Sequence, residues 1–180
     1  MREYPHQFSG GMRQRVVIAI ALASNPKLLL ADEPTTALDV TIQAQVLELM
    51  RELIGKSNMS LILITHDLGV VAETCDKVCI MYAGEIVETG LVKTVYRNPR
   101  HPYTRGLFES IPRLEDDDVR LTPIEGSIPN PAALPEGCKF HPRCKYCSEI
   151  CKKEAPPVRV DQETGQSFMC HFDLFNGGGE

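Results

Sequence analysis

The sequence has 180 residues, of which 43% are hydrophobic and 24% charged, and its formal net charge is −5. This length suits one domain with a core, or one small domain with an appendage, and the acidic balance gives no support for nucleic-acid binding. The longest apolar runs, Val16–Ala23 and Leu28–Ala31, are far shorter than the roughly 20 residues that span a bilayer, so we expect no direct membrane insertion. The first six residues lack the apolar core of a secretory signal, which predicts a cytoplasmic location.

The first half of the chain alternates between helix and strand patterns. A helix is expected over Met12–Ser24, with Ser9 as its N-cap and Asn25-Pro26 as its end. Four apolar residues bounded by proline and acids predict a short buried strand at Leu28–Asp32. Thr41–Gly55 carries apolar residues at helical spacing, which predicts an amphipathic helix.

The alternation continues beyond that helix. Ser60–Thr65 predicts a second buried strand, and Leu68–Cys75 a further helix. The stretch VCIMYAGEIVETG predicts two strands joined at Ala83-Gly84. Together these elements predict an α/β fold with helices packed on a sheet, whose ligands bind beyond the carboxyl ends of the strands.

Two candidate sites lie at element ends. Asp32-Glu33 and His66 each follow a predicted strand, so they are expected to face one crevice. An aspartate there can hold Mg²⁺, and an adjacent carboxylate can polarise an attacking water; solvated strand-end charges are the alternative. Ser9 and Gly10-Gly11 open a helix, where free amides can meet a phosphate, and simple capping is the alternative.

Four motifs in order resemble those of the ATP-binding subunits of ABC transporters, from about Tyr4 to Gly90. FSGGMRQR resembles the signature motif, LLLADE the Walker B strand with its catalytic glutamate, TALD the D-loop, and ITHD the switch-histidine segment. The resemblance implies the carboxyl-terminal half of an ABC-type P-loop ATPase domain over residues 1–97. A small irregular cysteine-rich extension over 98–180 would follow it.

The resemblance also implies roles for individual residues. Glu33 and His66 would be catalytic, Glu33 by orienting or deprotonating the hydrolytic water and His66 by contacting the γ-phosphate. Asp32 would hold Mg²⁺ through water, and Asp39 would link the two sites of a dimer. The implied nucleotide-site residues are Ser9, Gly10, Gly11, Gln14, Asp32 and Asp39. A structural histidine at His66 and a helix N-cap at Asp39 are the alternatives.

The phosphate-binding pattern G-x-x-x-x-G-K-[ST] does not occur in the 180 residues. Met1 is therefore interpreted as an internal methionine of a longer subunit, or as the start of a truncated reading frame. The resemblance implies that each ATP lies between the phosphate loop of one subunit and the signature of another. We accordingly expect no ATPase activity from this chain alone, and a non-hydrolysing metal-binding fragment is the alternative function.

The substrate class is indicated by a second resemblance. NPRHPYTRGLFESIP, with the proline-rich cysteine segment behind it, resembles the extension of dipeptide/oligopeptide permease ATPases. This implies ATP-driven peptide uptake, although nickel importers share much of the pattern. The implied partners are a second, unlike ATPase subunit and integral-membrane permease subunits, which would hold the chain on the inner face of the cell membrane.

Five of the seven cysteines lie in the last third, behind a proline-rich connector that places a boundary near Asn98–Pro129. In a reducing cytosol clustered thiols indicate metal ligands more than disulfides, and four thiolates suit Zn²⁺ or an iron–sulfur cluster. Unligated cysteines are the alternative. The permease resemblance implies a [4Fe–4S] cluster, with Zn²⁺ as the alternative, and leaves Cys147 as a spare or competing thiol. The implied ligands are Cys138, Cys144, Cys151 and Cys170.

The cysteine segment carries few large apolar side chains, among them Phe140, Tyr146 and Phe168. A segment of this size cannot easily build its own core. Metal binding is therefore expected to organise it.

Overall fold

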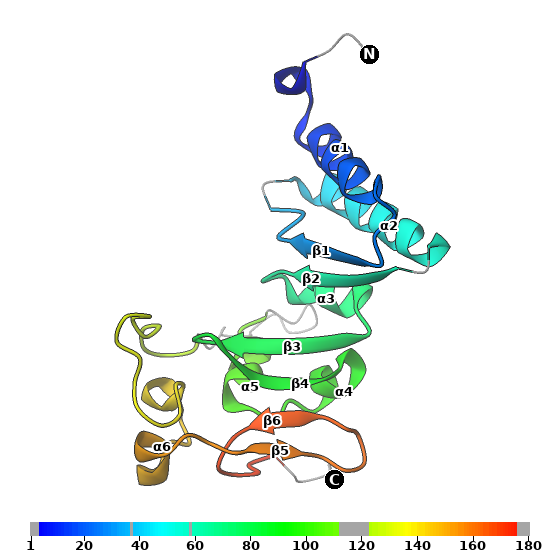
Figure 1. Ribbon diagram of the computed structural model, residues 1–180. Coiled ribbons are helices and arrows are strands. Elements are labelled where there is room, and N and C mark those ends of the chain that lie inside the picture. The colour runs from blue at the N-terminus through cyan, green and yellow to red at the C-terminus, as the bar shows by residue number, and fades with distance from the viewer. Residues whose placement is uncertain (1–3, 37, 58, 112–122, 176–180) are drawn as a thin grey trace, which may run out of the picture. The chain divides into compact units, whose positions relative to one another are not determined.

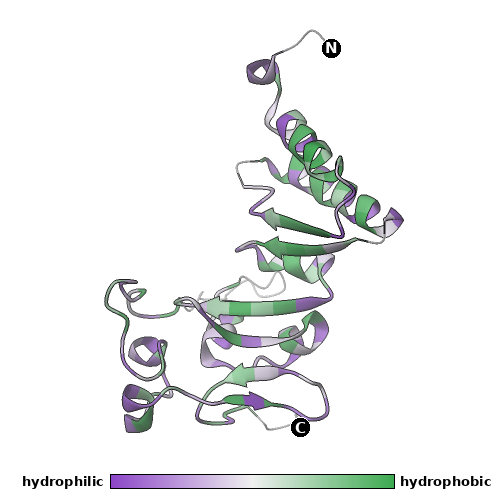
Figure 2. Cartoon of the chain, in the orientation of Figure 1, coloured by the Kyte–Doolittle hydropathy of each residue, from purple (hydrophilic) through white to green (hydrophobic). Residues whose placement is uncertain are grey.

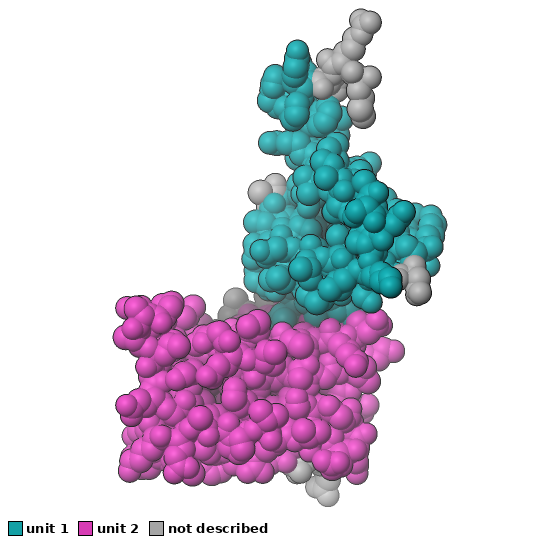
Figure 3. All heavy atoms as spheres, in the orientation of Figure 1, with its two compact units in different colours: residues 1–75 teal, residues 76–180 magenta. Residues whose placement is uncertain are grey.

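The structure is a computed structural model that describes residues 4–36, 38–57, 59–111 and 123–175. It divides into two compact units, Met1–Cys75 and Asp76–Glu180 (Figure 3). The domain division at residue 97 stays a prediction, because packing units and family domains need not share a boundary. Among the described helices, none is long and apolar enough to cross a bilayer.

The first unit consists of three helices and a pair of strands (Figure 1). Strands β1 and β2 are parallel and in register from Leu28↔Ser60 to Asp32↔Ile64, so their carboxyl ends lie at the same edge. This is the arrangement predicted from the sequence, with element ends shifted by no more than two residues. The elements are a 3-10 turn Pro5–Gln7, α1 Gly10–Leu22, β1 Leu28–Asp32, α2 Val40–Lys56, β2 Ser60–Ile64 and α3 Leu68–Thr74.

The core of this unit lies between α1, α2 and one face of the two strands. Ile18, Ala31, Val46 and Met50 are its buried centre, and leucines from both strands pack around them. The helix α1 begins at Gly10 and not at Met12, because Ser9 already caps it. The first turn therefore contains both glycines.

The opposite face of the strands differs from the prediction of buried strands. Leu28, Leu30, Ile62 and Ile64 are exposed, Leu30 by 65%, and Figure 2 shows that both strands are strongly apolar. Parallel sheets are usually covered on both faces. In the described part of this unit, the packed cluster lies on one face only, so half of each strand remains accessible.

The second unit is built on a four-stranded antiparallel sheet in the order β3-β4-β6-β5. The predicted hairpin is confirmed, and its turn residues Ala83 and Gly84 have φ values of +48° and +82°. A tight two-residue hairpin turn of this kind requires a positive φ at both of its central residues. The elements are β3 Lys77–Tyr82, β4 Glu85–Leu91, α4 Val92–Arg97, α5 Pro102–Glu109, a 3-10 turn His141–Arg143, α6 Glu149–Lys153, β5 Val158–Val160 and β6 Ser167–Met169.

The cysteine segment is not wholly irregular, because it adds two strands to this sheet. Strand β6 pairs with β4 through Glu88↔Phe168, and β5 pairs with β6. The proline-rich connector has no helix or strand in its described part, residues 123–137, and residues 112–122 lie outside the described residues.

The aromatic residues of the cysteine segment also find partners outside it. Phe140 is buried, with its ring centroid 5.1 Å from that of Tyr82 and 5.5 Å from that of Tyr103. Phe168 is buried under the guanidinium of Arg100, which lies 4.9 Å from the ring centroid. The segment therefore shares the core of β3, β4 and α5 and does not build a core of its own, and its organisation by a metal stays a prediction.

Candidate functional site

The paired acids stand where β1 ends. Asp32 is the last residue of the strand, and the backbone N–H of Glu33 donates to the carbonyl of Ile64 in β2 at 2.9 Å. Glu33 has a φ of +43°, in the left-handed region that is unfavourable for residues with a Cβ. Such a conformation at the end of a strand is typical of functional positions.

The carboxylate of Glu33 is held from two sides. The hydroxyl of Thr36 donates to Oε2 at 2.8 Å, and Nδ1 of His66 lies 3.0 Å from Oε1. The hydrogen bonds from Thr36 and then His66 lower the pKa of Glu33 below its ordinary value. The side chain is therefore ionised at neutral pH and can accept a proton, and the prediction that Glu33 and His66 meet at one edge is confirmed.

The loop of His66 is fixed by a residue to which the sequence assigned no role. Asp67 caps α3 by accepting from the backbone N–H groups of Gly69 and Val70, and its other oxygen accepts from Gln43 in α2 at 3.2 Å. The side chain of His66 itself is 78% exposed, so it is free to meet a ligand. An Asp immediately before a helix is an ordinary N-cap signal.

The start of α1 carries the other predicted nucleotide residues. The hydroxyl of Ser9 accepts from the backbone N–H of Met12 at 3.3 Å, Gly10 and Gly11 form the first turn, and Gln14 follows half-buried. A Cβ at Gly11 would lie 2.6 Å from Cγ2 of Ile42, so this glycine also permits close packing of α1 on α2. In the described residues no hydrogen bond joins this turn to Glu33 or His66.

Asp39 caps α2, as the alternative interpretation predicted. Its Oδ1 accepts from the backbone N–H of Ile42 at 2.9 Å. A role across a dimer stays a prediction, because a cap and an intersubunit contact can use the same exposed side chain.

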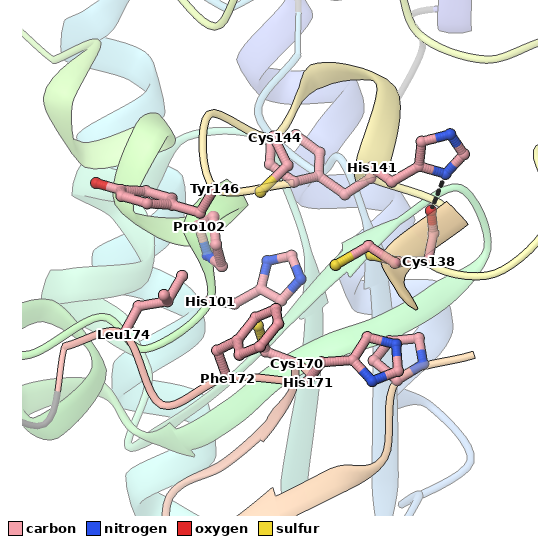
Figure 4. Close-up of a pocket in the computed structure, with 13 residues that line it drawn as sticks. His101, Pro102, Cys138, His141, Cys144, Tyr146, Cys170, His171, Phe172 and Leu174 are labelled. Atoms are coloured by element: carbon pink, nitrogen blue, oxygen red, sulfur yellow. Dashed lines mark hydrogen bonds between the residues drawn. The ribbon is translucent and has the colours of Figure 1, made fainter. Parts of the chain in front are cut away.

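The four predicted cysteine ligands line one small cavity of about 20 Å³. Its walls are almost entirely apolar apart from the thiols and three histidines. Figure 4 shows Cys138, Cys144 and Cys170 among the residues that line the cavity together with His101. Cys147 does not line the cavity, and its Sγ lies 3.6 Å from the carbonyl oxygen of Ser148.

Three of the thiols must lose their protons before they can bind a metal. Burial raises the pKa values of Cys138 and Cys170, and raises that of Cys144 to about 11. At neutral pH these groups are protonated, whereas a metal-bound thiol loses its proton. Binding of a cationic group would therefore release these protons.

The arrangement of the side chains limits which metal group this cavity can hold. Within the described ranges, no set of three or more His, Cys, Asp or Glu side chains is arranged to hold one metal ion. Four thiols nevertheless line the same cavity.

Two family models match the sequence, an ABC transporter model at residues 1–36 and a model of the oligopeptide/dipeptide transporter C-terminal region at residues 87–151. The oligopeptide transport ATP-binding protein AppD of Bacillus subtilis (strain 168) is 55% identical over 170 residues, which cover 94% of this chain and 52% of AppD. The dipeptide transport ATP-binding protein DppD of Escherichia coli (strain K12) is 51% identical over 175 residues, covering 97% and 53%. The chain belongs to the ATP-binding proteins of oligopeptide and dipeptide ABC transporters.

The chain spans about half the length of these relatives. Among solved structures, cbiO1 of Clostridium perfringens, part of the ABC transporter complex cbiONQ, aligns with a TM-score of 0.49 and 34% identity, over 52% of this chain and 37% of that one.

The two family matches contain most of the candidate residues of this ABC transporter protein. The ABC transporter match includes the signature turn, Asp32 and Glu33, and the C-terminal-region match includes Cys138, Cys144, Cys147 and Cys151. Asp39, His66 and Cys170 lie outside both. Their roles therefore depend on the geometry and on the sequence prediction.

A buried polar network in the second unit was missed by the sequence prediction. The carboxylate of Glu88 is 1% exposed and accepts from the backbone N–H groups of Arg100 and His101 at 2.8 and 2.9 Å, and from the amide of Gln166. Arg100 in turn binds the carboxylates of Asp161 and Asp173. The network joins β4, the start of α5 and the cysteine segment, which are remote in sequence.

Proposed function

We propose that this chain supplies the signature and Walker B elements of an ATP-binding subunit that couples ATP hydrolysis to the uptake of dipeptides or oligopeptides. The observation that carries the proposal is the Glu33–His66 pair at the carboxyl ends of two parallel strands. The names of the relatives favour peptides over nickel, the alternative left open by the sequence.

Glu33 is proposed as the general base. Its carboxylate is ionised, it is oriented by Thr36 and His66, and it accepts the proton of the water that attacks the γ-phosphate. His66 meets Glu33 through Nδ1, which leaves Nε2 to contact a phosphate oxygen. Asp32 is proposed to hold Mg²⁺. The bound ion would neutralise negative charge on the phosphates of ATP.

The turn Ser9–Gly11 is proposed to bind the nucleotide of a second ATP-binding subunit. It opens a helix of 13 residues, whose first-turn amides and positive dipole end favour a phosphate. Gln14 lies one turn further on, and Asp39 is proposed to contact the other site.

The proposed assembly comprises two unlike ATP-binding subunits bound to integral-membrane permease subunits. The chain would thus act at the cytoplasmic face of the membrane without entering the bilayer. The support is the family membership, because the named relatives are transport ATP-binding proteins.

A [4Fe–4S] cluster is proposed at the cavity of the second unit. Its support is that Cys138, Cys144, Cys151 and Cys170 line one apolar cavity, while the described side chains are not arranged to hold a single ion. Such a cluster supplies redox capacity or a structural crosslink. A single Zn²⁺ is the alternative, and it would require the four sulfurs to move closer together.

The transport proposal is tested in a chimera. Residues 4–175 of this chain replace the matching residues of E. coli DppD in a strain that lacks DppD and needs an external amino acid. The chimera is expected to restore growth on a dipeptide that contains this amino acid, and the same chimera with Glu33→Gln is expected to fail. A stable, membrane-associated chimera that takes up no dipeptide would refute the proposed function.

A further inference from the structure

His101 is the buried residue at which the polar network meets the cysteine cavity. It is 2% exposed, lines the cavity and caps α5. Its backbone N–H donates to Glu88 at 2.9 Å, its Nδ1 accepts from the backbone N–H of Tyr103 at 3.0 Å, and its ring centroid lies 5.7 Å from that of Phe140. The hydrogen bond to Nδ1 and the contact with Phe140 thus orient the ring, and the bond to Glu88 fixes the backbone of His101.

These contacts define the protonation of the ring. Because Nδ1 accepts a hydrogen bond, the hydrogen-bond network assigns the ring proton to Nε2. No partner for Nε2 is found among the described residues, and Nε2 is not one of the fully enclosed polar atoms that lack a partner, so it is accessible from the cavity that the ring lines.

The other two histidines of the cavity are placed differently. Nδ1 of His141 lies 3.0 Å from the carbonyl oxygen of Cys138, and Nε2 of His171 lies 3.0 Å from that of Glu154. Both side chains are partly accessible to solvent, so water can satisfy their second nitrogen. His101 is only 2% exposed, and it lines the cavity together with the four cysteines (Figure 4).

We propose that the Nε2–H of His101 donates a hydrogen bond to a sulfur atom of the metal group held by the four cysteines, which makes His101 a positioning residue of that centre. The inference rests on the proposed metal site and not on the transport activity. A donor aimed at a thiolate or sulfide withdraws charge from the sulfur, which favours the more negative, reduced state. Because Glu88 of β4 accepts a hydrogen bond from the backbone N–H of His101, this contact also connects the metal centre to the sheet.

Two substitutions separate this hydrogen bond from the structural role of the side chain. In His101→Asn the amide oxygen takes the place of Nδ1, so the cap of α5 is retained, whereas the donor at the position of Nε2 is lost. In His101→Gln the longer side chain can return an N–H donor to that position. His6→Asn, at an exposed histidine of the first unit, is the control.

The full chain and the three variants are purified without oxygen and compared for iron and sulfide content, for the rate of iron transfer to a chelator, and for reduction midpoint. His101→Asn is expected to bind iron but to lose it about 10–100-fold faster, as is typical when such outer contacts are removed, and to be reduced at a lower potential. His101→Gln should recover most of both properties. His6→Asn should match the unaltered protein.

Three results would overturn the inference. Equal iron loss and midpoint in His101→Asn and the unaltered protein would exclude the hydrogen bond. Equal impairment in His101→Asn and His101→Gln would show a purely structural role. If the unaltered protein bound neither iron nor zinc, both the proposed metal site and this inference would be wrong. The transport proposal would still be tested separately, by dipeptide uptake in the DppD chimera. If zinc is bound, the chelator comparison applies unchanged.

Discussion

Nδ1 of His66 lies 3.0 Å from Oε1 of Glu33, although the two residues are 33 positions apart and leave different strands. The parallel register of β1 and β2 brings them together, since Asp32 is paired with Ile64 and each side chain follows within two residues. The pair therefore depends on the sheet and not on local sequence.

Glu33→Gln is expected to slow ATP hydrolysis by roughly 10²–10⁴-fold in the assembled chimera, because the amide cannot accept the proton of the attacking water. The measurement is phosphate release at saturating ATP. Glu48→Gln, an exposed position on α2 paired with Arg51, is the control and should leave the rate unchanged. Equal rates for Glu33→Gln and the unaltered protein would assign the base elsewhere.

Gly11→Ala is expected to lower the free energy of unfolding by about 1–3 kcal/mol, because the new methyl group would lie 2.6 Å from Cγ2 of Ile42. The matched variant Gly55→Ala has no atom within 4 Å of its new methyl group and should stabilise α2 by roughly 0.5–1 kcal/mol. Urea unfolding measures both. If Gly11→Ala were as stable as Gly55→Ala, the close packing of α1 on α2 would not limit this position.

Much of the first unit could be predicted from the sequence because its signals are local. The apolar runs at β1 and β2 are bounded by breakers, and the end of each strand indicates its functional residues. Strands β5 and β6 carry no comparable signal, since each has three residues and is defined by pairing with a distant partner. Likewise Glu88 and Arg100 look like surface charges in the sequence, and only the tertiary structure pairs them with buried donors and acceptors.

Glu88→Ala is expected to destabilise the protein by roughly 2–6 kcal/mol. It would leave the backbone N–H groups of Arg100 and His101 buried without an acceptor, at about 1–3 kcal/mol each. Thermal or urea unfolding measures the loss, and Glu136→Ala at an exposed position is the control. A change below about 1 kcal/mol would mean that water or another group replaces the carboxylate.

Asp161 is expected to make stability depend on pH in the acid range. The backbone N–H of Thr164, and to a smaller extent Arg100, lower the pKa of Asp161 below its ordinary value. A lowered pKa in the folded state stabilises the fold above the ordinary pKa of an aspartate, and this contribution is lost as pH falls through the lowered value. The unfolding free energy should therefore fall more between pH 7 and pH 3 in the unaltered protein than in Asp161→Asn. Parallel pH profiles would contradict the assignment.

The cysteines offer a comparison within one segment, because Cys147 lies close in sequence to Cys151 but outside the cavity. Single changes to serine at Cys138, Cys144, Cys151 and Cys170 are each expected to lower bound iron to a small fraction of the unaltered content, since each removes one of four thiolate ligands. Cys147→Ser should retain iron and sulfide, because its thiol is directed to the carbonyl of Ser148. Iron and sulfide per chain after oxygen-free purification are the measurement. Loss of iron in Cys147→Ser, with retention in one of the four, would show that Cys147 is a ligand and that the cavity lining alone does not define the set.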